Sequence, residues 1–329
     1  MTILAPQKNL IVRLISWLKK PLIYKFKSIV MKILFIFYKS LFPILKVLKL
    51  LLFNNRLIRK ITFDLATPNT FLLSNGSQEK FIVASGDKGI GQSVFVDRDP
   101  FDFQKMITVI DFLGIQHKRS LLVEIGANIG TICIPAIKRN YFQRAIAIEP
   151  DPQNYSLLLA NIAINDLGAK ITTHNIALGE KDDEILFFEL SENNYGDHRI
   201  RKYSKEGFLG ESKRKVIEIK STTLDKIISE LDPTEVLIWL DVQGFEGYVL
   251  YGSSNALSKK PPICLEFWPY GMERSGCYLH LKDALINNGY SFFYNLEKTE
   301  SPIQLTQQTL DNLYNELGIN GDYTDLLVY

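Results

Sequence analysis

The chain has 329 residues, of which 46% are hydrophobic and 22% are charged, so it can bury a sizeable core in one large domain with an extension or in two domains. Its formal net charge of +2 hides an asymmetry: residues 1–60 hold 13 Lys and Arg and no acidic residue, and the rest of the chain holds 25 basic and 36 acidic residues. The three cysteines, Cys133, Cys264 and Cys277, form no close-spaced metal-binding pattern, which argues against a cysteine-ligated metal and favours a reducing compartment.

Residues 20–55 are strongly apolar but carry a stripe of lysines. Lys25, Lys32, Lys39 and Lys46 are spaced by seven residues, which places their ammonium groups on one side of a helix made of Ile, Leu, Phe and Val. A spanning helix needs about 20 predominantly apolar residues, and the lysines interrupt the run. We therefore expect residues 20–55 to lie on an anionic membrane surface, with the protein cytoplasmic and peripheral on the inner membrane face. The alternatives are a helix packed on the protein's own domain, a spanning helix and a cleaved targeting peptide.

The segment after this extension, residues 61–105, is predicted to form a small β-rich entry module ahead of the main domain, residues 106–329. Three short runs have the composition of strands, and turn-forming residues such as Asn75-Gly76 separate them. The three runs are Ile61 to Leu65, Lys80 to Val83 and Ser93 to Asp97.

Two helices can be read from the spacing of apolar residues. Phe103 to Leu113 repeats apolar residues at intervals of three and four and stops at Gly114, a typical helix end. Asp151-Pro152 is a typical helix start, and Tyr155 to Ile164 follows it with a long apolar face.

Leu121 to Gly130 reads as a buried strand that runs into a turn with two glycines. The apolar run ends at Gly126, and a short helix resumes at Thr131, which leaves backbone N–H groups pointing at whatever lies above the strand. Ala145 to Glu149 is a second apolar run, and it ends in an acid about 20 residues beyond the turn, where a βαβ unit places a ribose-binding carboxylate. Together the two runs predict a nucleotide-binding turn.

Strands and helices alternate from this point, which predicts a parallel sheet with helices on both faces and right-handed crossovers. Ligands bind such sheets at the carboxyl ends of the strands. The rule selects four places where a polar group follows an apolar run: Gly126 to Gly130, Glu149, His174-Asn175, and Asp241 after Leu237 to Leu240.

Five motifs resemble, in order, those of the FkbM-type S-adenosylmethionine-dependent methyltransferases. The motifs are Glu124 to Gly130, Ile148 to Pro152 with Asn161, Thr223-Leu224-Asp225, Asp241 to Glu246, and Leu265-Glu266. The resemblance covers about residues 92–295. It implies a Rossmann-like class I methyltransferase fold whose last strands form an antiparallel edge, S-adenosylmethionine as the cofactor, and methyl transfer to a hydroxyl of a sugar, glycolipid or natural product.

Two positions depart from the family pattern. The family commonly has Lys two residues before the strand-end Asp and Glu two residues after it, and this chain has Trp239 and Gln243 there. Any role that requires charge at either position is therefore in doubt.

The chemistry of the candidate ligands agrees with the resemblance. Asn128 and Thr131 stand at the third and sixth places, where a dinucleotide fingerprint needs glycine, which weakens the alternative of a nicotinamide-dependent reductase. Glu149 could accept both ribose hydroxyls. An ionised Asp241 needs either hydrogen-bonding partners or a cationic ligand after so apolar a run. The plainer alternative for Glu149 is a solvated loop acid, and that for Asp241 is a structural acid that caps the following helix. The residues expected to bind the cofactor are Glu124, Gly126, Ala127, Asn128, Gly130, Glu149, Pro150, Asn175 and Asp241.

The expected reaction is an in-line displacement in which a substrate hydroxyl attacks the sulfonium methyl group. Alignment of the reacting atoms should supply most of the rate acceleration. The candidate catalytic residues are Asp241, Glu246 and His198, and Asn194 to His198 is expected to be a substrate-side loop. Ser212 to Lys215 has the composition of a solvated basic loop. The sequence predicts no metal site and no nucleic-acid partner. A further alternative is a catalytically silent membrane-associated binding module.

Overall fold

The computed structural model describes scattered residues from 28 to 46 and then residues 54–329, apart from 69, 77, 115–120, 203–206, 229–235, 299 and 300. The chain divides into two compact units, Met1–Arg59 and Lys60–Tyr329. In the first unit the described residues between 28 and 46 are helical, and most of the predicted membrane-surface helix, residues 20–55, lies outside the described residues. No helix in the described part of the chain is both long enough and apolar enough to cross a membrane.

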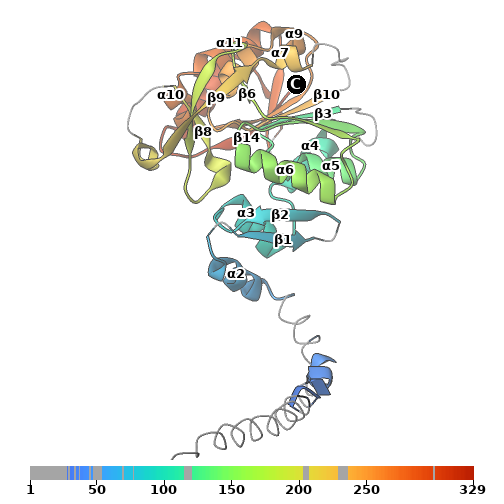
Figure 1. The fold of residues 1–329 in the computed structure, drawn as a ribbon. Coiled ribbons are helices and arrows are strands. Elements are labelled where there is room, and N and C mark those ends of the chain that lie inside the picture. Colours follow the sequence, from blue (N-terminus) through green and yellow to red (C-terminus); the bar gives the residue numbers. More distant parts are fainter. Residues whose placement is uncertain are drawn as a thin grey trace, which may run out of the picture. The chain divides into compact units, whose positions relative to one another are not determined.

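The second unit is built around an eight-stranded sheet with the order β13-β12-β14-β11-β10-β3-β4-β5. Strands β3, β10 and β14 of this sheet are labelled in Figure 1. The five strands on one side are parallel, as predicted: β5 (Ile171–His174), β4 (Arg144–Ile148), β3 (Leu121–Ile125), β10 (Val236–Leu240) and β11 (Ile263–Phe267). The predicted antiparallel edge is also present and comprises β14 (Thr324–Val328), β12 (Phe292–Asn295) and β13 (Ile303–Gln304).

The central strands are buried on both faces, so alternate side chains enter two separate cores. Val123 and Ile238 point into one core, whereas Leu122 and Leu237 point into the other. The first core is covered by α7 (Leu224–Ile227), α8 (Glu246–Tyr251), α9 (Ser254–Leu257), α10 (Pro269–Ser275), α11 (Tyr278–Asn287) and α12 (Gln307–Leu317). The second is covered by α4 (Phe103–Leu113), α5 (Cys133–Lys138) and α6 (Pro152–Ile164), which lie together below the sheet in Figure 1.

Both predicted helices are confirmed. Helix α4 ends at Gly114, which has the left-handed φ of 62° that glycine adopts without strain. In α6, Asp151 is the N-cap, and its side chain accepts a hydrogen bond from the backbone N–H of Asn154. All three cysteines are free and buried.

A second, four-stranded sheet is inserted between β5 and β10, with the order β6-β9-β7-β8. Its strands are β6 (Ala177–Leu178), β7 (Ile185–Leu190), β8 (Arg199–Arg201) and β9 (Lys215–Thr222). Two short 3₁₀ turns, η1 (Tyr195–Asp197) and η2 (Glu211–Lys213), lie in its connections. The expected substrate-side loop, residues 194–198, is therefore the connection that runs into β8.

The entry segment contains one hairpin and two helices instead of three strands. The hairpin pairs β1 (Phe71–Asn75) with β2 (Lys80–Ala84), so the strand predicted at Lys80 to Val83 is confirmed. The other two strand predictions are wrong: Ile61 to Leu65 belongs to α2 (Arg56–Leu65), and Ser93 to Asp97 belongs to α3 (Ile90–Asp97). For α3 the reason is Asp87, whose carboxylate accepts the N–H groups of Gly89 at 3.1 Å and Gly91 at 2.6 Å and so fixes the helix start.

Two asparagines, Asn161 in α6 and its C-cap residue Asn165, bond the open edge of β2. Asn161 accepts the N–H of Ile82 at 2.6 Å and donates to the carbonyl of Ile82 at 3.2 Å. Asn165 makes the same pair of bonds with Lys80, at 3.1 and 2.7 Å. Since a side-chain amide carries a donor and an acceptor, as a peptide group does, the two side chains replace a neighbouring strand. The hairpin is thereby fixed to the helix that follows β4.

Candidate active site

The turn after β3 packs so tightly that only glycine fits at Gly126. Its φ is +87°, and a Cβ atom there would lie 1.8 Å from the carbonyl oxygen of Asp241 at the end of β10. Both this residue and Ala127 donate their N–H groups to the carbonyl of Ile148, at 2.9 Å each. The ends of three neighbouring strands, β10, β3 and β4, therefore converge on this turn.

Glu149 follows β4 and is held by the backbone on both sides. Its Oε2 accepts the N–H of Asn128 at 2.8 Å, and its Oε1 accepts the N–H of Asp151 at 2.8 Å. Only 4% of the residue is exposed, and this burial raises the pKa of its carboxyl to about 8. These two hydrogen bonds fix the position of the carboxylate beside the turn.

Two cavities border this turn, and a third adjoins both of them at Asp241. We call the first, of about 600 Å³, the turn cavity; its walls include Gly126, Glu149, Phe188, His198 and Asp241. A smaller one, the inner cavity, is lined by Glu124, Ala127, Thr131, Trp239 and Asp241. The third, the acidic cavity, is open, measures about 960 Å³ and is lined by Asp102, Asp197, Asp241, Glu266 and Asp325, with Lys105 as its one basic side chain among the described residues.

The connection into β8 closes over the turn cavity. The carbonyl of Tyr195 accepts two side-chain amides, from Asn128 at 3.1 Å and from Asn154 at 3.0 Å. The N–H of the same residue donates to Asp87 at 3.1 Å. At the end of the connection, the Nδ1 of His198 accepts the N–H of Ser191 at 2.9 Å. Residues from the turn, α6 and the entry segment thus fix one connection of the inserted sheet.

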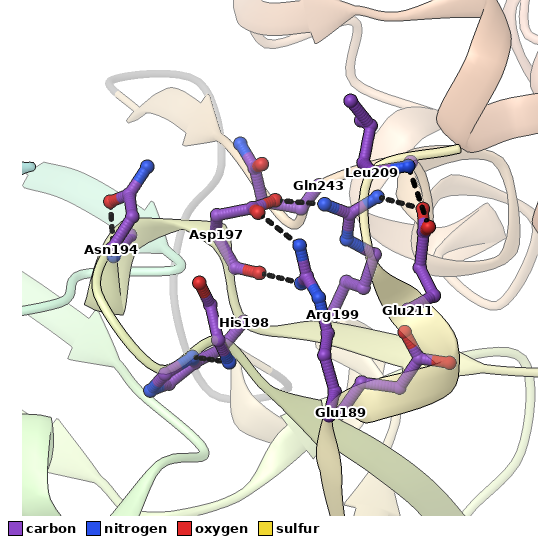
Figure 2. A network of polar contacts seen from close by, with 12 residues as sticks. Glu189, Asn194, Asp197, His198, Arg199, Leu209, Glu211 and Gln243 are labelled. Atoms are coloured by element: carbon purple, nitrogen blue, oxygen red, sulfur yellow. Dashed lines mark hydrogen bonds and ion pairs between the residues drawn. The ribbon is translucent and has the colours of Figure 1, made fainter. Parts of the chain in front are cut away.

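A network of ion pairs secures the other side of this connection (Figure 2). Asp197 pairs with both Arg199 and Arg214, and Arg199 also donates to Glu211 at 3.2 Å. The guanidinium of Arg199 lies 4.7 Å from the ring centroid of Trp268, in the range of cation–π attraction. The prediction that Ser212 to Lys215 is a solvated loop is therefore wrong for Arg214, since only 6% of its side chain is exposed.

Three carboxylates gather where β10 and β11 end. Asp241, Glu246 and Glu266 each offer an oxygen atom, and these atoms lie within 4.8 Å of one another. Gln243 lies among them and donates its Nε2 to Asp241 at 2.9 Å and to Glu266 at 3.1 Å. Burial raises the pKa of Asp241 to about 6 and that of Glu246 to about 8, because each charge is poorly solvated and faces another negative group.

Comparison with known proteins supports the resemblance. The model of the methyltransferase FkbM domain matches residues 124–292, just over half of the chain. The chain belongs to the FkbM methyltransferase family. This confirms the predicted enzyme class and cofactor, because methyltransferases of this family use S-adenosylmethionine. No curated protein matches the chain.

Several solved methyltransferases resemble the chain weakly. A methyltransferase FkbM from Methylobacillus flagellatus is 17% identical with a TM-score of 0.40; the match covers 72% of this chain and 52% of that one, so this chain spans about half of the longer relative. TYW2 from M. jannaschii, solved with AdoMet, is 14% identical with a TM-score of 0.35, and the match covers 80% and 86%. The tRNA methyltransferase TrmK from B. subtilis is 11% identical with a TM-score of 0.36, and the match covers 70% and 66%. At these values the family assignment rests on the domain match.

In this FkbM-family chain most of the predicted cofactor residues line the cavities. Gly126, Asn128, Glu149, Pro150 and Asp241 line the turn cavity, and Glu124 and Ala127 line the inner cavity. Gly130 has a φ of +89° and donates to the carbonyl of Ala127. Asn175 donates its side-chain amide to the carbonyls of Glu149 and Pro150, at 2.8 and 3.1 Å, and therefore supports the loop that carries Glu149.

The three predicted catalytic residues, Asp241, Glu246 and His198, lie in different parts of the site. Asp241 lines all three cavities, and His198 lines the turn cavity. Glu246 is fully buried at the start of α8, and its Oε1 accepts the N–H groups of Val242 at 3.1 Å and Gly244 at 3.2 Å. The structure therefore does not bring the three together at one cavity wall.

Sequence reasoning missed most of the acidic cavity. Asp102, Lys105, Trp268, Tyr323 and Asp325 line it but belong to three separate segments, and Lys105 and Asp325 are 220 positions apart in the chain. Lys105 donates to Asp325 at 2.5 Å and to Asp102 at 3.2 Å. Only Trp268 carried a signal, since it follows directly after a strand that ends at the functional edge of the sheet.

Proposed function

We propose that the protein binds S-adenosylmethionine across the turn and inner cavities and transfers its methyl group to a hydroxyl of an acceptor in the acidic cavity. The observation that carries this proposal is the position of Asp241, the predicted site residue that lines all three cavities. Donor and acceptor must approach within about 3.5 Å for an in-line displacement. A residue common to all three cavities marks where that approach can take place.

The adenosine part of the cofactor is assigned to the turn cavity. Ile148, Ile176, Leu178 and Phe188 supply apolar walls there, which suit a flat adenine ring. Glu149 lies at its mouth, and each of its oxygens keeps a lone pair beyond the backbone bond described above, so it can accept the two ribose hydroxyls.

The amino-acid end of the cofactor is assigned to the inner cavity. Glu124 and Asp241 both line it, and carboxylates there favour the ammonium group and the positive sulfonium. Glu124 accepts the N–H of Cys133 at 3.0 Å, and burial raises the pKa of its carboxyl to about 8. A bound ammonium would keep this carboxylate ionised.

The acceptor is assigned to the class of neutral polyhydroxyl compounds such as sugars. Trp268 and Tyr323 offer aromatic faces in the acidic cavity, and its carboxylates can accept hydroxyl protons. The excess of negative charge disfavours a nucleic-acid acceptor, because phosphates would be repelled.

For catalysis we assign proton acceptance to Asp241 and supporting roles to the other two candidates. Among Asp241, Glu246 and His198, only Asp241 lines the acidic cavity, and with a pKa of about 6 its carboxylate is ionised at neutral pH. The hydroxyl oxygen attacks the methyl carbon, the carbon–sulfur bond breaks, and S-adenosylhomocysteine leaves. His198 is held neutral, because burial lowers its pKa, and it packs edge-on against Phe188 beside the cofactor.

The direct test is calorimetry with S-adenosylhomocysteine. We expect Glu149→Ala and Asp241→Asn each to weaken binding about tenfold or more, whereas Glu218→Gln, an exposed acid on β9, leaves it unchanged. Equal affinities in all four proteins would reject this site. Binding of the cofactor without transfer of labelled methyl groups to any component of cell-envelope extracts would favour the silent binding module.

A further inference from the structure

We propose that the carboxylates at the ends of β10 and β11 hold a hard divalent cation, Mg²⁺, Mn²⁺ or Ca²⁺, with Asp241 and Glu266 as ligands and Gln243 as a third. The cation would lie at the wall of the acidic cavity, which Asp241, Gln243 and Glu266 all line. The binding itself follows from these side chains alone. Its use in the reaction, to orient and polarise the acceptor hydroxyl, rests on the proposed function.

The register of the sheet creates the cluster. Strands β10 and β11 are parallel neighbours, with Leu240 opposite Leu265, so the next residue of each strand, Asp241 and Glu266, lies at the same edge. Glu246 enters from the first turn of α8. Two oxygens on opposite sides of a Ca²⁺ ion, each about 2.4 Å from it, are about 4.8 Å apart, and the three carboxylates of this cluster lie within 4.8 Å of one another. For Mg²⁺, whose ligand distances are about 2.1 Å, the cluster would contract slightly.

A second, independent observation concerns Glu246. It is 0% exposed, and although its Oε1 is held by two backbone N–H groups, its Oε2 is buried without a hydrogen-bond partner among the described residues. A buried charge normally has its hydrogen-bonding capacity satisfied, and an unsatisfied oxygen costs about 1–3 kcal/mol or more. A cation in the cluster would stabilise this carboxylate.

Among the described residues, no basic side chain is ion-paired with the cluster, although the charge of Lys105 acts on Asp241 and Glu266 from a distance. Within the described part of the chain, no Lys, Arg or His side chain forms an ion pair with Asp241, Glu246 or Glu266. The nearby ammonium of Lys105 is already shared by Asp102 at 3.2 Å and Asp325 at 2.5 Å. Three carboxylates so close together therefore require protons or an external cation.

Gln243 shows how the site can accept the ion. In the structure its Nε2 donates to both Asp241 and Glu266, so an amide group occupies the position between the two carboxylates. The two ends of a side-chain amide have nearly the same shape, and rotation of the amide by 180° turns the carbonyl oxygen toward the same point. Carboxylate and amide oxygens are the ligands that hard divalent cations prefer.

The test uses the full chain freed of metal with EDTA and titrated with Mn²⁺, and follows the signal of free Mn²⁺ by electron paramagnetic resonance. We expect one saturable ion per chain, about tenfold weaker binding in Asp241→Asn and in Glu266→Gln, and about tenfold tighter binding in Gln243→Glu, which adds a negative ligand. Asp182→Asn is the matched control, because this acid is exposed and pairs with Lys226 in the inserted sheet region.

The Gln243→Glu variant distinguishes the loss of a ligand from the loss of folding, because an unfolded protein could not bind Mn²⁺ more tightly. Absence of saturable Mn²⁺ binding in the wild type, or equal affinity in all variants, would overturn the proposal. Parallel titration of the metal-free wild type with S-adenosylhomocysteine separates the two proposals. Cofactor binding without ion binding would refute the cation site alone, and ion binding without cofactor binding would refute the proposed function alone.

Discussion

The side-chain amide of Asn128 donates a hydrogen bond to the carbonyl oxygen of Tyr195 at 3.1 Å, and so joins the turn after β3 to the inserted sheet. Its Oδ1 accepts the N–H of Ile129 at 2.8 Å, which supports the turn itself. The residue at the third place of the glycine pattern thus serves two purposes: it braces its own turn and fixes the connection that closes the turn cavity.

Removing this side chain should loosen that connection. We expect Asn128→Gly to weaken S-adenosylhomocysteine binding about tenfold, from the loss of both side-chain hydrogen bonds and the ordering they provide. Glycine is chosen because Asn128 has a φ of 49°, where alanine would add backbone strain. Calorimetry measures the affinity, and amide hydrogen exchange should show faster exchange in residues 194–198. Unchanged exchange there would show that the bond does not hold the connection.

Substitution of Gly126 should be severe. Alanine would place a Cβ 1.8 Å from the carbonyl oxygen of Asp241 at a φ of +87°, so we expect Gly126→Ala to lower the free energy of unfolding by about 3 kcal/mol or more, or to prevent folding. Gly168→Ala is the matched control, because nothing lies within 4 Å of a Cβ there. Urea denaturation compares the two. Similar stability of both variants would contradict the close approach of β3 and β10.

The stability of the cofactor-free protein should fall as pH rises. Burial raises the pKa of Glu124 to about 8 from its ordinary value of 4.5, so the folded protein binds a proton that the unfolded chain releases. This contribution is full below pH 4.5 and is lost as pH rises to about 8. Glu124→Gln, which keeps an acceptor for the N–H of Cys133, should reduce the decline in unfolding free energy between pH 5 and 8.5. An equal decline in the wild type and the variant would refute this assignment, and Glu218→Gln serves as the exposed control.

The side chain of Asn161 should contribute strongly to stability. Asn161→Ala would leave both the N–H and the carbonyl of Ile82 without their partner at the edge of β2, and we expect a loss of about 2–4 kcal/mol. Leu159→Ala, on the same helix but 44% exposed, should cost far less. Urea denaturation gives both values. A cost for Asn161→Ala no larger than that for Leu159→Ala would show that the hairpin does not depend on this bond.

Deletion of residues 1–55 should test the predicted membrane-surface interaction separately from the fold. The second compact unit begins at Lys60, so we expect a folded remainder that no longer sediments with anionic vesicles, because most of the basic residues of the extension are lost. Neutral vesicles are the control for the wild type. Vesicle binding that survives the deletion would end the proposal of a membrane-surface extension.

The sequence by itself determined the parallel core of this protein. Strong local signals coincide there: the apolar run Leu121 to Ile125, the glycine turn after it, and the Asp151-Pro152 start of α6 each favour one local structure. Strand ends in a parallel sheet meet at one edge, so the sequence alone places Gly126, Glu149 and Asp241 together.

Only the tertiary structure decided the acidic cavity and the entry segment. The strand-like composition of Ser93 to Asp97 was overridden by the packing of Val94, Phe95 and Val96 in the second core, because propensity is weak beside tertiary interactions. Asp102, Lys105 and Asp325 meet through the packing of distant elements, and the cluster of Asp241, Glu246 and Glu266 depends on sheet register and the entry angle of α8. Such contacts join residues that have no fixed spacing in the chain, so no local sequence pattern predicts them.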